Sequence, residues 1–247
     1  MNILLIDIET RPSLAYVWSL WDDRVPLDRL IEEGEMICFA AKWLDDPVVH
    51  FKSTFHNGKP AMLRHAWDMF DRADAVMHYN GTRFDIPHLC REFVQAKMLP
   101  PSPYKQIDLL NTVKRRFRFV SNKLAHVAPA LGLDGKVENG GFQLWLDCMA
   151  GNKKAWATMR EYNVRDVTLL EELYHVLQPW ILGHPHRGLY DGLDEGCCPS
   201  CGSDSTIRKG YAHTPTSTFQ QYLCKDCGRW FRGTKSIERV GTRDVAA

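Results

Sequence analysis

Ile3-Leu4-Leu5-Ile6-Asp7-Ile8-Glu9-Thr10 is an apolar run near the start of the chain that contains two carboxylates. A short run rich in apolar residues predicts a buried strand. Because residues two apart on a strand point to the same face, we expect Asp7 and Glu9 to lie side by side. Two like charges this close repel unless a cation lies between them, and carboxylate ligands suit Mg²⁺ or Mn²⁺. The alternative is a strand end that reaches solvent, where acids are tolerated.

The composition predicts a folded protein with charge concentrated in particular regions. The chain has 247 residues, of which 45% are apolar and 25% charged, which suits one α/β domain with a small appendage. The formal net charge of +1 predicts no general attraction to nucleic acid, but residues 114–118 and the chain from Ile207 onward are locally basic. Neither a signal peptide nor a membrane span is visible. We therefore expect a cytoplasmic protein, or one in the host cytoplasm if a phage encodes it, with no membrane partner.

The periodicity predicts strands first and helices later. Short apolar strands are expected at about 3–9, 36–44, 47–53 and 74–79, and helices at about 60–72, 85–97, 109–117, 122–128 and 153–178. This order predicts an α/β fold with a mixed sheet flanked by helices rather than a pure βαβ array. Residues 11–34 carry Trp18 and Trp21 among charges, and a lid, a substrate platform and simple packing all remain open for them.

Three further side chains extend the acidic pattern. Asp85 opens a predicted helix shortly after Asn80, where an acid can be a plain N-cap or can lie at the mouth of the sheet. Tyr162 and Asp166 are four residues apart on a predicted helix and share its apolar face. An acid on that face needs a partner, which could be a buried backbone group, an arginine or a metal ion.

Taken together, these segments resemble the three motifs of the DEDD 3′–5′ exonuclease superfamily. Asp7-Ile8-Glu9-Thr10 is similar to the first motif, and the stretch from Asn80 to Phe84-Asp85 is similar to the second. Tyr162 with Asp166 is similar to the third motif in its tyrosine-bearing (DEDDy) form. The resemblance covers roughly residues 1–178 and implies a ribonuclease-H-like fold.

The resemblance also implies roles for the matching residues. Asp7, Glu9, Asp85 and Asp166 would hold two Mg²⁺ or Mn²⁺ ions that drive phosphodiester hydrolysis. Tyr162 would orient the attacking water, because a phenol is a poor base at neutral pH. Thr10 and Asn80 would contact the terminal nucleotide.

The remaining polar and aromatic candidates have simpler interpretations. Phe84 is kept as a candidate substrate contact, although core packing is more typical of its position. His78, His88 and His126 are interpreted as structural, and Asp108 as a helix cap for which a supporting role stays open.

The cysteines predict a zinc ribbon. Cys198 and Cys201 form one Cys-x-x-Cys pair, Cys224 and Cys227 form another, and 22 residues separate the pairs. Four thiolates at this spacing, each pair followed by glycine, fit one structural Zn²⁺. Two disulfides or a redox pair are the alternatives, and the adjacent Cys197 could compete as a ligand. Isolated cysteines in apolar surroundings are expected to be reduced core thiols: Cys38, Cys90 and Cys148.

The predicted ribbon is basic and aromatic. Tyr222, Trp230 and Phe231 alternate with cations, which suits backbone contact and base stacking, although these rings could simply cover the ribbon. The ribbon resembles those of transposase- and transcription-associated proteins. We expect a nuclease domain at 1–182, a linker at 183–196, the zinc ribbon at 197–235 and a tail at 236–247.

The resemblance therefore implies a metal-dependent 3′–5′ exonuclease acting on single-stranded or frayed DNA, with a replication or repair protein as a further partner. The form of the first two motifs favours DNA, as in polymerase proofreading domains. An RNA exonuclease and a structure-specific endonuclease on the same fold remain open. The non-enzymatic alternative is a zinc-ribbon protein that only binds nucleic acid.

Overall fold

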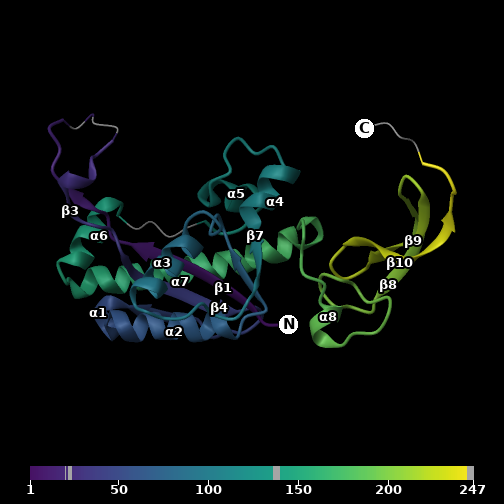
Figure 1. The fold of residues 1–247 in the computed structure, drawn as a ribbon, viewed down its shortest axis with the longest axis horizontal. Coiled ribbons are helices and arrows are strands. Elements are labelled where there is room, and N and C mark those ends of the chain that lie inside the picture. Colours follow the sequence, from purple (N-terminus) through teal and green to yellow (C-terminus); the bar gives the residue numbers. More distant parts are fainter. Residues whose placement is uncertain (20, 22–23, 136–139, 244–247) are drawn as a thin grey trace. The chain divides into compact units, whose positions relative to one another are not determined.

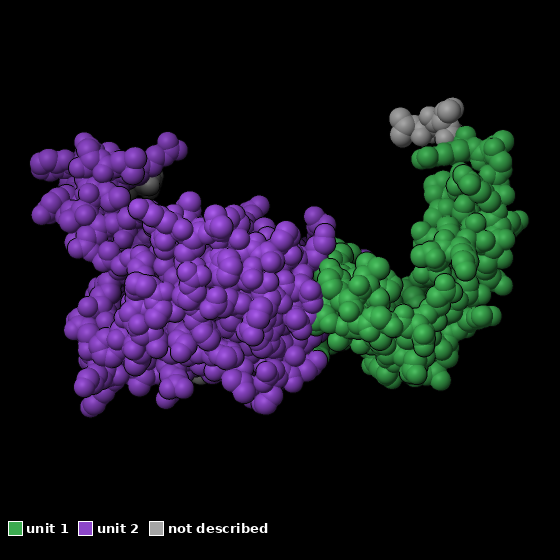
Figure 2. Space-filling model, turned by 60° about the horizontal axis from the view of Figure 1, so that its bottom comes forward, with its two compact units in different colours: residues 1, 175–247 green, residues 2–174 purple. Residues whose placement is uncertain are grey.

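The computed structural model describes residues 1–19, 21, 24–135 and 140–243. The chain divides into two compact units, coloured separately in Figure 2. One unit comprises Asn2–Tyr174, and the other comprises Met1 together with the residues from His175 onward. The division falls inside a helix, earlier than the linker expected at 183–196.

A five-stranded sheet forms the centre of the larger unit (Figure 1). In spatial order its strands are β5 (His50–Ser53), β4 (Met36–Trp43), β1 (Ile3–Thr10), β6 (Ala75–His78) and β7 (Lys105–Asp108). The β1–β4 and β4–β5 pairs are antiparallel, whereas the β1–β6 and β6–β7 pairs are parallel. The predicted mixed sheet is therefore confirmed.

Helices of the larger unit follow the predicted ranges closely. The helices at predicted positions are α2 (Lys59–Asp71), α3 (Asp85–Gln95), α4 (Leu109–Arg116), α5 (Leu124–Ala130) and α7 (Lys153–Leu177). The prediction missed β7 and the helices α1 (Thr54–Asn57) and α6 (Phe142–Met149). β7 reads Lys-Gln-Ile-Asp with only Ile107 buried, and this gives too little apolar alternation to indicate a strand.

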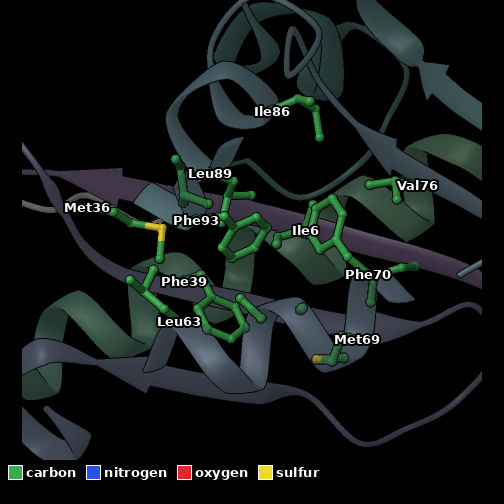
Figure 3. Packing of buried hydrophobic residues seen from close by; sticks show 14 of the residues in the cluster. Ile6, Met36, Phe39, Leu63, Met69, Phe70, Val76, Ile86, Leu89 and Phe93 are labelled. Carbon is green, nitrogen blue, oxygen red and sulfur yellow. The ribbon is translucent and has the colours of Figure 1, made fainter. Parts of the chain in front are cut away.

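Packing on the two faces of the sheet follows the alternation along its strands. Leu4, Ile6 and Ile8 of β1 pack in one cluster with buried residues of α2 and α3 (Figure 3). A second cluster joins Cys38 of β4 to α6 and α7. Burial of one large aliphatic side chain stabilises the fold by about 1.5–3 kcal/mol, so the first cluster anchors β1 to α2 and α3 and the second anchors the neighbouring β4 to α6 and α7.

An arm follows β1 at residues 11–34. Its strands β2 (Leu14–Ala15) and β3 (Leu30–Glu32) pair antiparallel, with a short 3-10 helix η1 (Leu27–Arg29) before β3. Tyr16 is 75% exposed, and Trp18 and Trp21 are each 89% exposed. Simple packing, one of the three possibilities left open for this segment, is therefore wrong for these rings.

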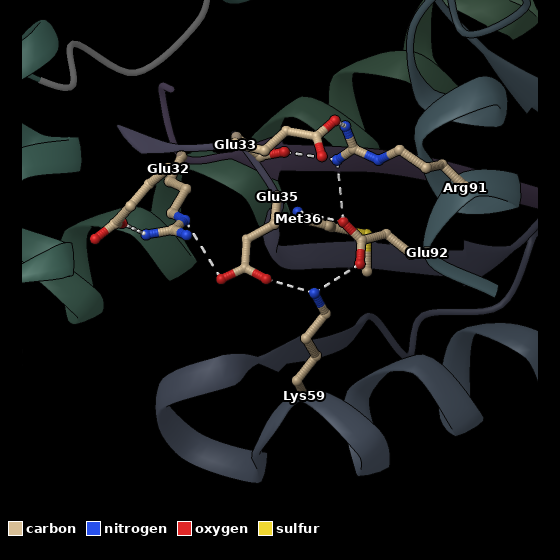
Figure 4. A network of polar contacts seen from close by, with 9 residues as sticks. Glu32, Glu33, Glu35, Met36, Lys59, Arg91 and Glu92 are labelled. Carbon is tan, nitrogen blue, oxygen red and sulfur yellow. Dashed lines mark hydrogen bonds and ion pairs between the residues drawn. The ribbon is translucent and has the colours of Figure 1, made fainter. Parts of the chain in front are cut away.

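Ion pairs hold the base of the arm against α2 and α3 (Figure 4). Glu92 is the buried centre: its carboxylate accepts from Met36 N–H at 3.0 Å, pairs with Lys59 at 2.8 Å and pairs with Arg91 at 3.2 Å. Burial opposes the ionisation of Glu92, but these partners outweigh it and lower its pKa. The network also includes Arg11, Glu32, Glu33 and Glu35.

The smaller unit contains a three-stranded antiparallel sheet in the order β10 (Trp230–Arg239), β9 (Ser217–Cys224) and β8 (Thr206–His213). The 3-10 helix η2 (Gln178–Trp180) and α8 (Gly188–Asp191) precede it. The segment expected as a linker thus contains a helix, and β10 continues past residue 235 into the expected tail. No described helix is both long and apolar enough to cross a membrane.

Candidate active site

Strand register places Asp7 and Glu9 at the carboxyl edge of the parallel strands. Leu5 pairs with Met77 in the last β1–β6 pair, and β6 ends at His78. β1 continues to Thr10, so Asp7 lies two residues and Glu9 four residues beyond that last pair. Ligand sites of α/β sheets lie outside this edge.

A third carboxylate reaches the pair from α7. Ligand oxygens of Asp7, Glu9 and Asp166 all lie within 4.8 Å of one another, and Asp166 is buried. Three carboxylates this close repel one another strongly unless cations balance them. Hard oxygen donors in such a set fit Mg²⁺ or Mn²⁺.

Asp85 approaches the same strand from α3. It is the first residue of α3 and follows the N-cap residue Phe84. Its Oδ1 accepts the backbone N–H of Ile8 at 3.1 Å, and its side chain is buried. The fourth predicted acid is thereby attached to the backbone between Asp7 and Glu9.

Asn163 is a member of this site that the sequence interpretation missed. It is fully buried, and its Nδ2 donates to Asp7 Oδ2 at 2.6 Å and to Asp7 O at 3.2 Å. Its Oδ1 is buried without a hydrogen-bond partner in the described part of the chain. An unsatisfied buried oxygen costs about 1–3 kcal/mol, which a bound water or ion would remove. The signal available in the sequence was an amide next to Tyr162, on a helix already expected to face the acids.

Tyr162 lies on α7 one turn before Asp166 and is 9% exposed. It belongs to the apolar cluster that contains Cys38, and Cys38 is the β4 residue paired with Glu9. The ring of Trp145 packs edge-on against Tyr162 at 6.2 Å. Burial, with the charges of Glu9 and Asp7, raises the pKa of the Cys38 thiol well above its usual value, so Cys38 stays a neutral packing residue.

The loop between β6 and α3 is built around His78. The Nδ1 atom of His78 accepts Gly81 N–H at 3.1 Å, and its Nε2 lies 3.2 Å from Gln106 Oε1. Burial lowers the pKa of His78, which agrees with a neutral, structural imidazole. A Cβ on Gly81 would lie 2.4 Å from His78 Cγ, so glycine is needed for this close approach. These contacts therefore fix the conformation of the loop that leads to Asp85.

Asn80 and Asp108 are joined at the same edge. Asp108 is the N-cap of α4, as expected: its Oδ1 accepts from Leu110 N–H at 3.0 Å and also from Asn80 N–H at 3.0 Å. Asn80 adopts a left-handed conformation with φ of 71°. Asp108 thus holds the backbone of the loop that carries Asn80.

The other two predicted substrate contacts lie at the ends of their elements. Thr10 ends β1 at a register shift opposite Met36 and is half-buried. Phe84 is 41% exposed and packs edge-on against His88 at 4.7 Å. The expectation that Phe84 is a core residue is wrong, because its ring is partly exposed and does not belong to the core cluster that contains α3 residues.

The four predicted zinc cysteines converge in the smaller unit. Their sulfur atoms lie within 4.8 Å of one another, with 3.6 Å between Cys198 and Cys227 and 3.6 Å between Cys201 and Cys224. Tetrahedral Zn–S bonds of about 2.3 Å require sulfurs about 3.8 Å apart, so the donor set fits Zn²⁺. All eight cysteines are free in this structure, and Cys90, which was expected in the core, is exposed. Cys197 is not a member of the sulfur cluster.

Rings on the ribbon contact cations and each other. Tyr222 and Phe231 stack at 5.3 Å with 13° between their planes. Lys209 lies 5.5 Å from the centroid of Trp230, and Arg232 lies 3.7 Å from that of Phe219. A cavity of about 580 Å³ opens beside Tyr222 and Phe231. Both expected roles, covering the ribbon and offering contact surface, are compatible with this arrangement.

Comparison with known proteins identifies the family. The model of the RNase H superfamily matches residues 31–178, more than half of the chain. The chain belongs to the RNase H superfamily. The matched range of this RNase H superfamily member includes Asp85, Tyr162 and Asp166, whereas Asp7 and Glu9 precede it. No curated protein matches the chain.

A solved structure shares the fold of this RNase H superfamily member. The family B DNA polymerase from the hyperthermophilic archaeon Pyrobaculum calidifontis is similar with a TM-score of 0.55 and 17% sequence identity. The similarity covers 72% of this chain and 24% of the polymerase, so the chain spans about a quarter of that protein. At this identity the likeness establishes the ribonuclease-H-like fold, in agreement with the family match.

Proposed function

We propose that this RNase H superfamily member is a metal-dependent 3′–5′ exonuclease that hydrolyses phosphodiester bonds of single-stranded or frayed DNA. The observation that carries the proposal is the convergence of Asp7, Glu9 and Asp166 within 4.8 Å, with Asp85 bonded to the amide of Ile8. This donor set suits two Mg²⁺ or Mn²⁺ ions.

Each residue of the site has a defined task in this proposal. Bound divalent ions supply an activated water and stabilise the leaving 3′ oxygen. Asp7, Glu9 and Asp166 would hold the ions directly, and Asp85 would support their binding from α3. Tyr162 orients the attacking water by hydrogen bonding, because a phenol is too weak a base at neutral pH.

The substrate contacts and the ribbon complete the proposal. Thr10 and Asn80 contact the terminal nucleotide, and the exposed ring of Phe84 is available for base stacking. The four cysteines hold one structural Zn²⁺, and the ribbon binds nucleic acid or a replication or repair protein. DNA is proposed over RNA because the first two motifs resemble proofreading domains.

The decisive experiment is digestion of 5′-end-labelled single-stranded DNA and RNA of the same sequence, with Mg²⁺ or with EDTA. We expect a ladder that shortens from the 3′ end, faster on DNA, only with Mg²⁺. Asp7→Asn is expected to abolish the ladder and keep the fold, whereas the exposed Asp68→Asn is the matched control and is expected to keep full activity.

Three outcomes would contradict the proposal. Cleavage of circular single-stranded DNA would indicate the endonuclease, and faster digestion of RNA would indicate the RNA exonuclease. Nucleic-acid binding with no hydrolysis under any metal condition would leave the non-enzymatic alternative.

A further inference from the structure

The last turn of α4 and the residues after it carry four cations in five positions. Lys114, Arg115, Arg116 and Arg118 are all exposed, and no acid occurs between Asn111 and Ser121. Within residues 1–19, 21, 24–135 and 140–243, none of the four has an ion-pair partner. We call these four residues the α4 basic surface.

Several arginines elsewhere in the same unit are paired. Arg11 contacts Glu32 and Glu35, Arg91 contacts Glu33 and Glu92, and Arg165 contacts Glu172. Cations in the last turn of a helix do complement its dipole, by about 0.3–1 kcal/mol each. That effect does not account for Arg118, which lies beyond the end of α4. A protein with a net charge of only +1 thus leaves a local cluster of four positive charges open to solvent.

Hydrogen bonds attach both ends of this segment to the active-site loop. At its start, Asp108 caps α4 and binds Asn80 N–H at 3.0 Å. At its end, Tyr79 Oη donates to the carbonyl of Asn122 at 2.6 Å. Burial raises the pKa of Tyr79, so its hydroxyl stays protonated and able to donate. The loop at Tyr79 and Asn80 leads directly to Asp85. These two hydrogen bonds therefore hold the segment next to the loop that carries one of the carboxylates.

The position of the α4 basic surface and its mixture of cations and aromatic rings both suit single-stranded nucleic acid. A helix rises 1.5 Å per residue, so eight-residue α4 carries its cations about 12 Å from the strand edge. Phe117 and Phe119 lie among the cations as a half-buried ring pair with centroids 5.7 Å apart. Cations with interleaved aromatic rings suit the backbone and bases of single-stranded nucleic acid. A site of four carboxylates repels phosphates, so a cationic surface next to it would hold the strand in place.

We propose that the α4 basic surface binds the phosphate backbone of a single-stranded nucleic acid whose end lies at the carboxylate site. The position of that end rests on the proposed function, but the binding itself is measured without cleavage. The ligand is recognised by its polyanionic backbone, so the surface contributes affinity and salt dependence rather than base specificity.

The test uses the full chain with Asp7→Asn in EDTA, and fluorescence anisotropy with a 20-nucleotide single-stranded DNA or RNA between 50 and 300 mM NaCl. Each phosphate contact on a single strand contributes about 0.7 to the slope of log K against log salt. Arg115→Gln/Arg116→Gln is therefore expected to lower the magnitude of the slope by about 1.4 and weaken binding most at low salt. Arg115→Lys/Arg116→Lys keeps both charges and is expected to restore the slope.

Lys153→Gln/Lys154→Gln is the matched control, because it removes two exposed charges at the start of α7. We expect this control to keep the wild-type slope, and equal melting temperatures to verify folding of every variant. An unchanged slope in the arginine variant, an equal loss in the control, or no binding of the 20-mers would overturn the proposal. The first result would instead favour an acidic protein partner. The arginine variant could have a shallower salt dependence while the wild-type chain shows no nuclease activity with Mg²⁺. That result would support the α4 basic surface and contradict the proposed exonuclease.

Discussion

At the scale of single residues, the carboxylate site is held by contacts from two helices to one strand. Asp85 binds the Ile8 amide, and Asn163 binds both the carboxylate and the carbonyl of Asp7. Both contacts direct polar groups at β1 where β6 no longer pairs with it. The orientation of Asp7 is therefore determined before any ion binds.

Asn163→Leu tests this orientation, since leucine keeps the volume and removes the donor. A hydrogen bond to a charged group is worth about 1.5–3 kcal/mol, so we expect a loss of unfolding free energy of that order. We also expect a Mg²⁺ affinity about 10-fold weaker, as for lost partners of metal ligands. The measurement is the rise of melting temperature with Mg²⁺ concentration. The exposed Asn111→Leu is the control, and an unchanged Mg²⁺ midpoint in Asn163→Leu would contradict the positioning role.

At the scale of elements, the two candidate metal sites are built differently. The sheet that carries Asp7 and Glu9 packs against helices through two apolar clusters. The ribbon strands instead meet at four sulfur atoms, and Gly202 and Gly228, with φ of 82° and 75°, make the turns beneath the two cysteine pairs. We expect the folding of the ribbon to depend on the proposed metal ion much more than that of the carboxylate domain, because so short a segment buries little apolar surface.

Cys224→Ser is expected to lose bound zinc and unfold the ribbon, since a structural Zn²⁺ site contributes on the order of 10 kcal/mol. Cys197→Ser is the control, because Cys197 lies beside the cluster without belonging to it. Zinc content by mass spectrometry and calorimetric melting check both variants. One zinc per chain in Cys224→Ser, or zinc loss in Cys197→Ser, would contradict the assigned ligand set.

The exposed ring of Trp18 on the arm is expected to contribute little to stability. Trp18 is 89% exposed, whereas Trp156 is 3% exposed within the cluster of α6 and α7. We expect Trp18→Ala to change the unfolding free energy by no more than about 0.5 kcal/mol, and Trp156→Ala to lower it by about 3–5 kcal/mol. Urea unfolding of both variants measures the difference. An equal loss in Trp18→Ala would mean that the ring is packed in solution.

At the scale of the whole molecule, each compact unit contains a histidine that folding keeps neutral. Burial lowers the pKa of His78 in the larger unit, and burial lowers the pKa of His184 in the smaller unit to about 4. Unfolded histidine titrates near 6.5, so below that pH the unfolded chain binds more protons than the folded chain. Both units therefore lose stability as the solution becomes acidic.

His184→Gln tests the pH dependence of the smaller unit. The contribution of His184 is fully present above about pH 6.5 and is lost as the pH falls toward 4, so the variant is expected to have a shallower stability profile over this range. Thermal melting between pH 4 and 7 measures it. His213→Gln replaces an exposed histidine and is expected to keep the wild-type profile. An unchanged profile in His184→Gln would show that this imidazole does not contribute.

Sequence patterns by themselves determined the mixed sheet and the main helices, because strand and helix periods are local properties. The expected helix at 60–72 is α2, Lys59–Asp71, and the expected helix at 153–178 is α7, Lys153–Leu177. The carboxylates Asp7, Glu9 and Asp166 and the four ribbon cysteines were also identifiable, since acids in apolar runs and paired cysteines are unusual enough to stand out.

Only the tertiary structure decided how these residues meet. The Asp85 contact with Ile8 spans 77 positions and the Asn163 contact with Asp7 spans 156, and no local period encodes pairs so far apart. The exposure of Phe84 and Trp18 likewise depended on which surfaces the packed helices left open. Local chemistry selected the functional residue types, whereas strand register and helix packing determined which of them share a site.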